Sequence, residues 1–452
     1  MIADITKSTR KALIVLSALG ALAVDPFVET VHCAQRLVSR EQARHLGLDR
    51  AWFAQVRLDP ARNHVARAVL TSERLTVLTS AGIVHEFHAN TGETLWTASI
   101  GNPSFPSLGP AVSEQHVALL NGSTLYVLDR ADGRPIKVRR VGGAPGAAPG
   151  LGTEHVFVPL LNGRIEGYPL DEEILTPWYY QSNGRAIVPP LVTPQSLIWS
   201  TASGHLYVAK LQELGLRFRL ETGSDVLAQP AYRKPLIYVA TASGEVFAMH
   251  EDTAARHWKY ATGFPVNRAP AAVADRVYVT SQQPALHCVD AETGNAFWEA
   301  PDVTQFAAAS RTRVYGVDEL DALVVLDAAT GALLARMPTE GTLNALVNDQ
   351  TDRLYLVTED GAVQCLHEIG AKEPLFHHPP EGGEQPEAAA GDAPVGEAAA
   401  TDEALPATEP MPPADDEADP FGTADDAEAT EAEMPADADS FGVGGENPFG
   451  EL

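Results

Sequence analysis

Three cysteines are the side chains in this sequence best suited to form a metal site, a disulfide or a nucleophile: Cys33, Cys288 and Cys365. They form no Cys-x-x-Cys motif and no adjacent pair. Cys288 and Cys365 occupy nearly the same place in two repeated units that are two units apart, so their sulfur atoms are expected to lie too far apart for a disulfide. We therefore predict that both are small, buried, apolar side chains.

The histidines add little chemistry. His85 and His88 are three residues apart on one expected strand, so they face opposite sides and do not readily share a metal. His377 and His378 are expected to be solvated. The sequence has no His-Glu-x-x-His motif, no glycine-rich phosphate loop and no Gly-x-Ser-x-Gly motif. We predict no catalytic residue and no metal site.

The most regular candidates for a ligand site are aromatic side chains that recur along the chain. They are Trp52, Trp96, Trp178, Phe218, Trp258 and Trp298, with Ile136 at the corresponding place in the second unit. A row of rings could stack on a ligand, but a ring in nearly every unit is better explained by packing. Burying one such side chain contributes roughly 2–3 kcal/mol. We predict that these six aromatic residues dock neighbouring units against each other.

The aromatic residues recur because the chain is an array of similar units. A hairpin-turn residue repeats at intervals of 37–41 residues, at Gly82, Gly122, Gly163, Gly204, Gly244, Pro284, Asp321 and Gly361. Flanking runs such as 236–240 and 245–249 have the apolar patterns that are typical of strands. Glycine adopts a positive φ at little cost, and we therefore expect type I′ hairpin turns.

The two ends of the array are complementary. The last unit lacks a fourth strand, whereas the run 51–56 resembles a fourth strand but has no earlier strands before it. Pairing the two removes the exposed edges of an open array. We therefore predict an all-β fold, an eight-bladed β-propeller of four-stranded antiparallel blades over residues 49–376, closed by an N-terminal strand. The alternative, an open solenoid, would need polar caps and leaves the orphan strand unexplained.

The segments HANTGETLW (88–96) and VDAETGNAFW (289–298) resemble the A-x-D-x-x-T-G-x-x-x-W repeat of PQQ-like β-propellers. Segments 128–136 and 326–334 resemble it more weakly. This family includes quinoprotein alcohol dehydrogenases and BamB-type outer-membrane assembly factors. The resemblance implies the fold more strongly than any function. It also implies that the Trp and Gly of each repeat dock neighbouring blades.

The same resemblance raises the alternative of a quinoprotein-type oxidoreductase that binds PQQ in the propeller funnel. The enzymes of the family hold PQQ with two adjacent bonded cysteines, a Trp floor and a Ca²⁺ ion, beside an aspartate base. This sequence has no adjacent cysteines, and no repeat carries a long insertion that could build a funnel wall. We therefore expect no cofactor and a protein that is not an enzyme.

The N-terminus has the pattern of a secretory signal. Lys7, Arg10 and Lys11 precede an apolar run over 12–24, which is too short to span a bilayer. We predict a signal peptide over residues 1–34. A short buried helix, and a retained N-terminus on a cytoplasmic scaffold, remain the alternatives.

Residues 35–48 are predicted to form an N-terminal arm with a short helix. Ser39 and Gln42 have the spacing of a capping box, and Gly47 suits the position after the helix. The residues before Cys33 match a lipoprotein cleavage site poorly, so we expect no lipid anchor.

Residues 377–452 form a distinct acidic segment. Between 381 and 452 there are 21 Asp and Glu and no Lys or Arg, which leaves −7 of the net charge of −28 for residues 1–380. We expect disorder in this segment and no nucleic-acid binding anywhere in the chain. Candidate partner-binding motifs within it are Asp419, Pro420, Phe421, Gly422, Phe441, Asn447, Pro448, Phe449 and Gly450. Low-complexity drift is the competing interpretation.

These observations predict an exported, monomeric, non-catalytic protein-interaction scaffold of the periplasm or cell envelope. Its partner is a protein that the sequence does not identify, and any membrane association would arise through partners. The family resemblance implies outer-membrane protein assembly as one role.

Overall fold

The structure, a computed structural model, describes residues 38–171, 177–213, 215–339 and 343–377. Within these ranges the chain forms one α-helix and 32 β-strands. No helix among these residues is long and apolar enough to cross a membrane. The predicted signal segment 1–34, Cys33 and the candidate motifs between Asp419 and Gly450 lie outside the described residues.

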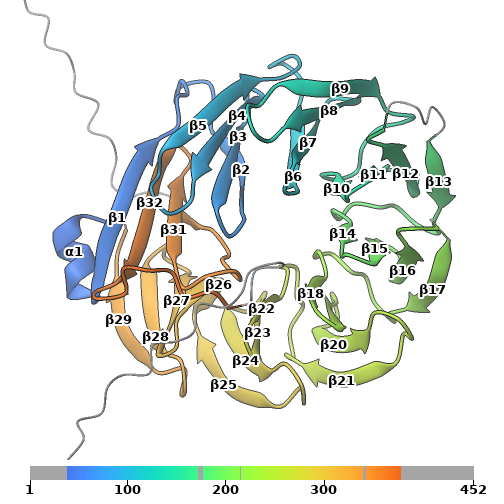
Figure 1. The fold of residues 1–452 in the computed structure, drawn as a ribbon. Coiled ribbons are helices and arrows are strands. Elements are labelled where there is room, and N and C mark those ends of the chain that lie inside the picture. Colours follow the sequence, from blue (N-terminus) through green and yellow to red (C-terminus); the bar gives the residue numbers. More distant parts are fainter. Residues whose placement is uncertain (1–37, 172–176, 214, 340–342, 378–452) are drawn as a thin grey trace, which may run out of the picture. The chain divides into compact units, whose positions relative to one another are not determined.

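The strands form eight four-stranded antiparallel sheets arranged as the blades of a ring (Figure 1), which confirms the predicted propeller. Blade 1 comprises β2 (Val65–Leu70), β3 (Arg74–Thr79), β4 (Ile83–His88) and β5 (Thr94–Ser99). Blade 2 comprises β6 (Ser107–Val112), β7 (His116–Asn121), β8 (Thr124–Asp129) and β9 (Pro135–Arg140). Blade 3 comprises β10 (Gly150–Leu151), β11 (His155–Pro159), β12 (Arg164–Pro169) and β13 (Trp178–Gln181). Blade 4 comprises β14 (Leu191–Val192), β15 (Ser196–Thr201), β16 (His205–Lys210) and β17 (Leu216–Glu221).

The second half of the ring repeats the arrangement. Blade 5 comprises β18 (Ala231–Arg233), β19 (Leu236–Ala240), β20 (Glu245–His250) and β21 (Arg256–Ala261). Blade 6 comprises β22 (Ala271–Val273), β23 (Arg276–Ser281), β24 (Ala285–Asp290) and β25 (Ala296–Pro301). Blade 7 comprises β26 (Val303–Ala309), β27 (Arg313–Asp318), β28 (Leu323–Asp327) and β29 (Leu333–Met337). Blade 8 comprises β30 (Leu343–Ala345), β31 (Leu354–Thr358), β32 (Ala362–Glu368) and β1 (Leu48–Gln55).

The N-terminal strand closes the ring as predicted. β1 is the outer strand of blade 8 and pairs with β32 in antiparallel register, from Leu48 opposite Glu368 to Gln55 opposite Ala362. In every blade the first strand lies toward the axis and the fourth at the rim (Figure 1). One blade is therefore built from both ends of the ring sequence.

The hairpin turns between the second and third strands differ from the expected type I′. In blade 1, Gly82 N donates to Thr79 O at 3.0 Å and Gly82 has a φ of +75°, while the residues before it keep negative φ. This is a type I turn followed by a left-handed glycine. Blade 2 is shorter, because Asn121 pairs directly with Thr124 across a two-residue turn.

The core lies between adjacent blades, where buried Val, Leu, Ile, Ala and Tyr side chains of the second and third strands meet. The arm contributes to one such core. Helix α1 (Arg40–His45) has the predicted capping box, with Ser39 Oγ accepting from Gln42 N at 3.2 Å. Ala43 and Leu46 pack with apolar side chains of blades 7 and 8.

Candidate functional site

Four tryptophan side chains join one blade to the next in the same way. Each is buried on the outer strand of its blade, and its Nε1 donates to the carbonyl of the residue that follows the third strand of the next blade. The bonds run from Trp52 to Ala89 at 2.7 Å, from Trp96 to Arg130 at 2.8 Å, from Trp258 to Ala291 at 2.9 Å and from Trp298 to Ala328 at 2.9 Å. We call this contact a latch. We call the interface between two adjacent blades a seam and name it by the two blade numbers. The latch is present at seams 8/1, 1/2, 5/6 and 6/7.

A glycine completes each latch. The four are Gly92, Gly133, Gly294 and Gly331, with φ between +71° and +75°. A Cβ atom added to any of them would lie 2.4–2.7 Å from the indole of the preceding blade. Glycine is therefore needed for two reasons. The backbone at this position is left-handed, and the indole ring occupies the space that a side chain would fill.

An aspartate shapes the turn that carries the glycine. Asp290 Oδ1 accepts from Thr293 N at 2.7 Å, Thr293 Oγ1 at 3.0 Å and Glu292 N at 3.0 Å. The hydrogen bond from Thr293 N is the main cause that lowers the pKa of the Asp290 carboxyl. Asp327 makes the same contacts with Thr330. The Asp-x-x-Thr-Gly pattern thus presents a carbonyl and a glycine without a side chain to the indole of the preceding blade.

The other predicted aromatic residues occupy the same position but pack differently. Trp178 and Phe218 are half-buried. Trp178 lies edge-on to Phe157 of its own blade, with ring centroids 6.3 Å apart. Phe218 packs against a cluster of blades 4 and 5 that Ala254 also contacts, and Ala254 stands in the place of the turn glycine with a φ of +62°.

The second unit required a correction. Ile136 does not dock a neighbouring blade, since its side chain is 42% exposed. Lys137 occupies the latch position instead, opposite Val127 in the strand pair, and its Nζ donates to Pro169 O of blade 3 at 2.6 Å. An ammonium group thus replaces the indole N–H at seam 2/3.

Two further seams depart from the latch in ways that the sequence did not predict. At seam 4/5, Arg217 Nη1 donates to Glu251 O at 3.3 Å, and that carbonyl is equivalent to Ala291 O in the latch of seam 5/6. At seam 7/8 the latch position holds Ala335, which is opposite Val325. The arm covers this seam.

The arm supplies a backbone carbonyl and a glycine like those that a blade turn supplies at other seams. Arg74 begins β3 and donates to Arg130 O of the next blade, and Arg276 begins β23 and donates to Ala328 O. Arg313 begins β27 in the same way, but its Nη1 donates to Leu46 O of the arm at 2.9 Å. Next to it, Gly47 has a φ of +73° and faces the Arg313 guanidinium.

The cysteines are part of this architecture. Cys288 pairs across the sheet with Trp298, and Cys365 pairs with Trp52. Both are free, and both are buried, as predicted. Burial raises the pKa of the Cys288 thiol to about 11 and that of the Cys365 thiol to about 12. Both are therefore protonated at neutral pH and are poor nucleophiles.

His287 is buried in blade 6, on the third strand beside Cys288. Its Nδ1 is 3.1 Å from Tyr260 Oη, its Nε2 is 3.3 Å from Ser281 Oγ, and Glu299 is 3.8 Å away. Burial lowers the pKa of His287 below its ordinary value, and Glu299 partly opposes this.

We therefore expect the free energy of unfolding to fall as the pH drops below about 6.5, because the unfolded chain then binds the proton more readily. The contribution of His287 is at most about 1.4 kcal/mol per pH unit. Urea unfolding between about pH 7.5 and pH 5.5 measures it. In a His287→Gln variant the slope should be shallower, and an unchanged slope would contradict the assignment.

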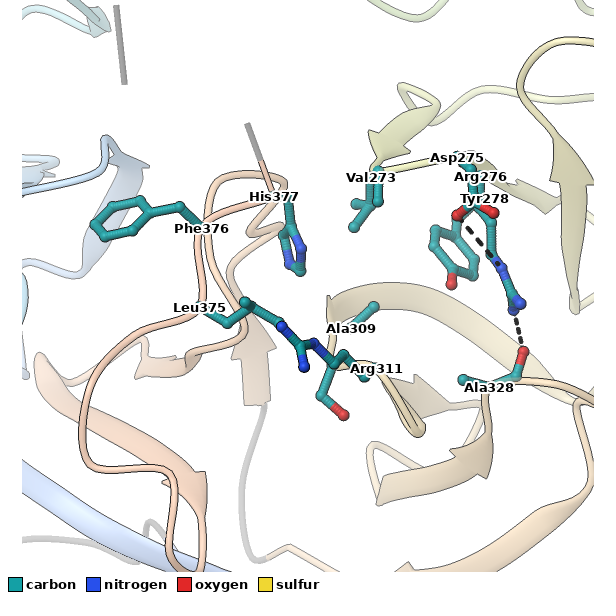
Figure 2. A pocket seen from close by; sticks show the side chains of 12 residues that line it. Val273, Asp275, Arg276, Tyr278, Ala309, Arg311, Ala328, Leu375, Phe376 and His377 are labelled. Carbon is teal, nitrogen blue, oxygen red and sulfur yellow. Dashed lines mark hydrogen bonds and ion pairs between the residues drawn. The ribbon is translucent and has the colours of Figure 1, made fainter. Parts of the chain in front are cut away.

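A pocket of about 310 Å³ opens beside blades 6 and 7 (Figure 2). Its walls include Arg276, Arg311 and His377, and Figure 2 shows Arg276 directed at Ala328 O. The segment 375–377 forms one side of the pocket, since Leu375 N donates to Asp352 Oδ1 at 3.0 Å and His377 N to Gln350 O at 2.9 Å.

The described residues contain no group of three or more His, Cys, Asp or Glu side chains that could hold a metal ion. The candidate motifs Asp419-Pro420-Phe421-Gly422, Phe441 and Asn447-Pro448-Phe449-Gly450 lie outside these residues. The geometry of the described part is that of a latched ring.

Comparison with known sequences identifies the family. The sequence profile described as outer membrane protein assembly factor BamB matches residues 51–213, 193–310 and 285–372. The chain belongs to this family. A BamB from Burkholderia pseudomallei (strain K96243) is 26% identical over 269 residues, which are 54% of this chain and 68% of that protein.

Solved structures add support for the fold alone. BamB from Moraxella catarrhalis superposes with a TM-score of 0.57 at 18% identity, over 71% of this chain and 99% of the other. The computationally designed Ika8 protein superposes with a TM-score of 0.54 at 14% identity, over 67% of this chain and 96% of the other. A designed protein matches almost as well as a natural one, so this similarity carries no function.

Within this BamB-family ring the latched seams form two groups. Seams 8/1 and 1/2 are adjacent, as are 5/6 and 6/7. Counting four residues from the turn glycine finds the latch position directly: Gly92 leads to Trp96, Gly133 to Lys137 and Gly331 to Ala335. That count is the signal in the sequence that would have identified Lys137.

Proposed function

We propose that this protein is a non-catalytic protein-interaction scaffold of the cell envelope that acts in outer-membrane protein assembly. The observation that carries the proposal is the match of the BamB family to residues 51–372, which is nearly the whole ring. The named relative from Burkholderia pseudomallei is itself an outer membrane protein assembly factor. A ring held by latches at its seams suits this role, because it presents its loops from a rigid frame.

The proposal assigns a role to each part of the chain. Residues 1–34 direct export and are removed, 35–48 form the arm, 49–376 form the ring, and 377–452 form an acidic extension with the Phe-Gly motifs. Export places the ring in the periplasm, where it binds protein partners as a monomer and reaches the membrane through them. The basic start and apolar run of the N-terminal segment support this location.

Affinity purification of a C-terminally tagged chain from cross-linked cells tests the partner. Proteins of the outer-membrane assembly machinery should be enriched over a tagged, unrelated exported protein, and absence of that enrichment would contradict the proposed function. N-terminal sequencing of the purified chain tests export, since an intact Met1 would show that no signal was removed. Tight binding of PQQ with Ca²⁺, together with dye-linked alcohol oxidation, would overturn the non-catalytic assignment.

The Phe-Gly motifs can be tested in the same purification. Deleting 441–452 removes Phe441 and Phe449 and should abolish recovery of a partner that docks there. A variant of equal length, with Phe441→Ser and Phe449→Ser, separates loss of the rings from loss of acidic chain. Recovery that is unchanged in both would contradict a docking role for these motifs.

A further inference from the structure

A groove of about 710 Å³ lies between blades 1 and 2, whose outer strands β5 and β9 are neighbours at the rim (Figure 1). Its walls come from the connection between the two blades, from the turn between β7 and β8, and from the ends of β8 and β9. The lining residues are Gly101, Asn102, Phe105, Asn121, Gly122, Ser123, Thr124, Tyr126 and Arg140. Arg140 is the only charged side chain among them.

The segment between β5 and β6, which includes Phe105, is fixed by hydrogen bonds to Asn121. The buried Asn121 side chain accepts from Asn102 N at 2.9 Å and donates to Asn102 O and Phe105 O, each at 3.1 Å. Gly101 lies so close to Asn121 that a Cβ there would be 2.2 Å from its Oδ1. Phe105 is nevertheless 54% exposed. The structure therefore fixes an aromatic side chain in solvent, beside the groove.

Blade 2 supplies a second apolar wall and a cation. Tyr126 is directly opposite Val138 in the strand pair and Thr124 is opposite Arg140, so these four side chains share one face. Val138 is 56% exposed. Arg140 is exposed, and its guanidinium forms no ion pair or hydrogen bond with any other residue that the structure describes.

The free guanidinium is unusual for this seam. Arg130 lies near it in sequence but is buried, with its Nε 3.0 Å from Glu86 Oε1 and its other nitrogens bound to Ser113 O and Thr71 Oγ1. Of the three basic residues of β9, Lys137 and Arg139 face blade 3 and Arg140 faces the groove, and no residue of this strand is acidic. Charge complementarity thus favours an anionic ligand here, and the exposed Phe105 and Val138 favour an apolar group beside it.

We propose that the groove between blades 1 and 2 binds an extended peptide segment in which an aromatic side chain is adjacent to carboxylates. The ring of the ligand packs on Phe105, Tyr126 and Val138, and a carboxylate pairs with Arg140. A bidentate carboxylate–guanidinium contact next to an aromatic cluster gives both affinity and orientation. This proposal depends on the proposed scaffold function in one respect, which is that the ligand of the groove is a peptide.

Fluorescence anisotropy with the purified full chain tests the groove. The probe is a labelled synthetic peptide, Gly-Ser-Asp-Phe-Glu-Ser-Gly, with a second peptide in which Ser replaces Phe. Arg140→Glu should weaken binding of the first peptide by about tenfold or more, and Phe105→Ser by about fivefold. A peptide with Lys in place of Asp and Glu should bind the Arg140→Glu variant about tenfold more tightly than it binds the wild type.

The connection between blades 5 and 6 offers matched controls. Phe264 is 45% exposed and Arg268 is exposed, but neither lines the groove. Phe264→Ser and Arg268→Glu should leave binding within about twofold of the wild type. Equal losses in the control and groove variants, equal binding of the Ser peptide, or no saturation by about 1 mM peptide would each overturn the proposal.

Failure of the peptide to bind would leave the proposed function in place, because that function is tested by purification from cells. Failure to recover assembly proteins would leave the groove in place, because the titration needs no cellular partner.

Discussion

A chain that begins at Val56, without residues 1–55, should fail to form a stable folded monomer. The deletion removes β1, which pairs with β32 over Leu48–Gln55, and with it the Trp52 latch of seam 8/1. Loss of a buried Trp alone costs about 3–5 kcal/mol, against a typical total stability of about 5–15 kcal/mol. The edge of β32 would also be left unpaired and open to aggregation. Size-exclusion chromatography and thermal unfolding by circular dichroism measure both effects.

Two shorter deletions separate the strand from the arm. Removing residues 1–37 leaves all described contacts and should leave the melting temperature unchanged. Removing 1–47 keeps β1 but loses the arm, with the Arg313–Leu46 hydrogen bond and the packing of Ala43, and should give an intermediate loss. A synthetic peptide of residues 38–56 should restore the folded ring to the chain that begins at Val56, and the same peptide with Trp52→Ser should restore it poorly. A stable monomer without residues 1–55 and without peptide would contradict closure by this strand.

The fold could be predicted because the turns and strands that define it recur along the sequence at a nearly constant interval. A hairpin turn every 37–41 residues fixes the number of blades, and the orphan strand at 51–56 fixes how the ring closes. Both conclusions depend on counting over hundreds of residues, so an error of one residue at any turn does not alter them. β1 pairs with β32, so the predicted closure is confirmed where the sequence separation is largest.

The position of a single side chain is far more sensitive to such an error. The second repeat has a two-residue turn at Gly122–Ser123, whereas blade 1 has three residues there, so counting from the turn glycine shifted the strand by one residue. A shift of one reverses the faces of a strand. The count therefore placed Ile136 at the position that corresponds to the aromatic residues, although Lys137 occupies it.

The arm could not be placed from the sequence for a different reason. Its role depends on Arg313 finding the carbonyl of Leu46, two residues that are 267 positions apart. No local pattern encodes that contact. The recurrence of Arg at the start of β3, β23 and β27 marks the donors, but only the packing of α1 on blades 7 and 8 identifies the acceptor.

The latch at seam 6/7 should be sensitive to a single added methyl group. Gly331→Ala places a Cβ 2.5 Å from the Trp298 ring in a backbone with a φ of +71°. The left-handed backbone costs Ala about 1–2 kcal/mol, and displacing the ring adds about 1–3 kcal/mol. Gly223 has a φ of +75° with nothing within 4 Å of a Cβ, so Gly223→Ala should show the backbone cost alone. Urea unfolding of both variants gives the two free energies.

A double-mutant cycle then decides whether the indole is the cause. Trp298→Ala should cost about 3–5 kcal/mol by itself, since it removes a buried ring and the hydrogen bond to Ala328 O. In that background there is no ring for the added methyl to displace, so Gly331→Ala should cost no more than Gly223→Ala does. The coupling energy between the two positions should accordingly be about 1–3 kcal/mol. If the cost of Gly331→Ala were the same with and without Trp298, the glycine would be needed only for its backbone, and the latch would be a hydrogen bond without a steric lock. The Asp-x-x-Thr-Gly pattern would then be explained by turn geometry alone, and its recurrence with Trp four residues later would need another cause.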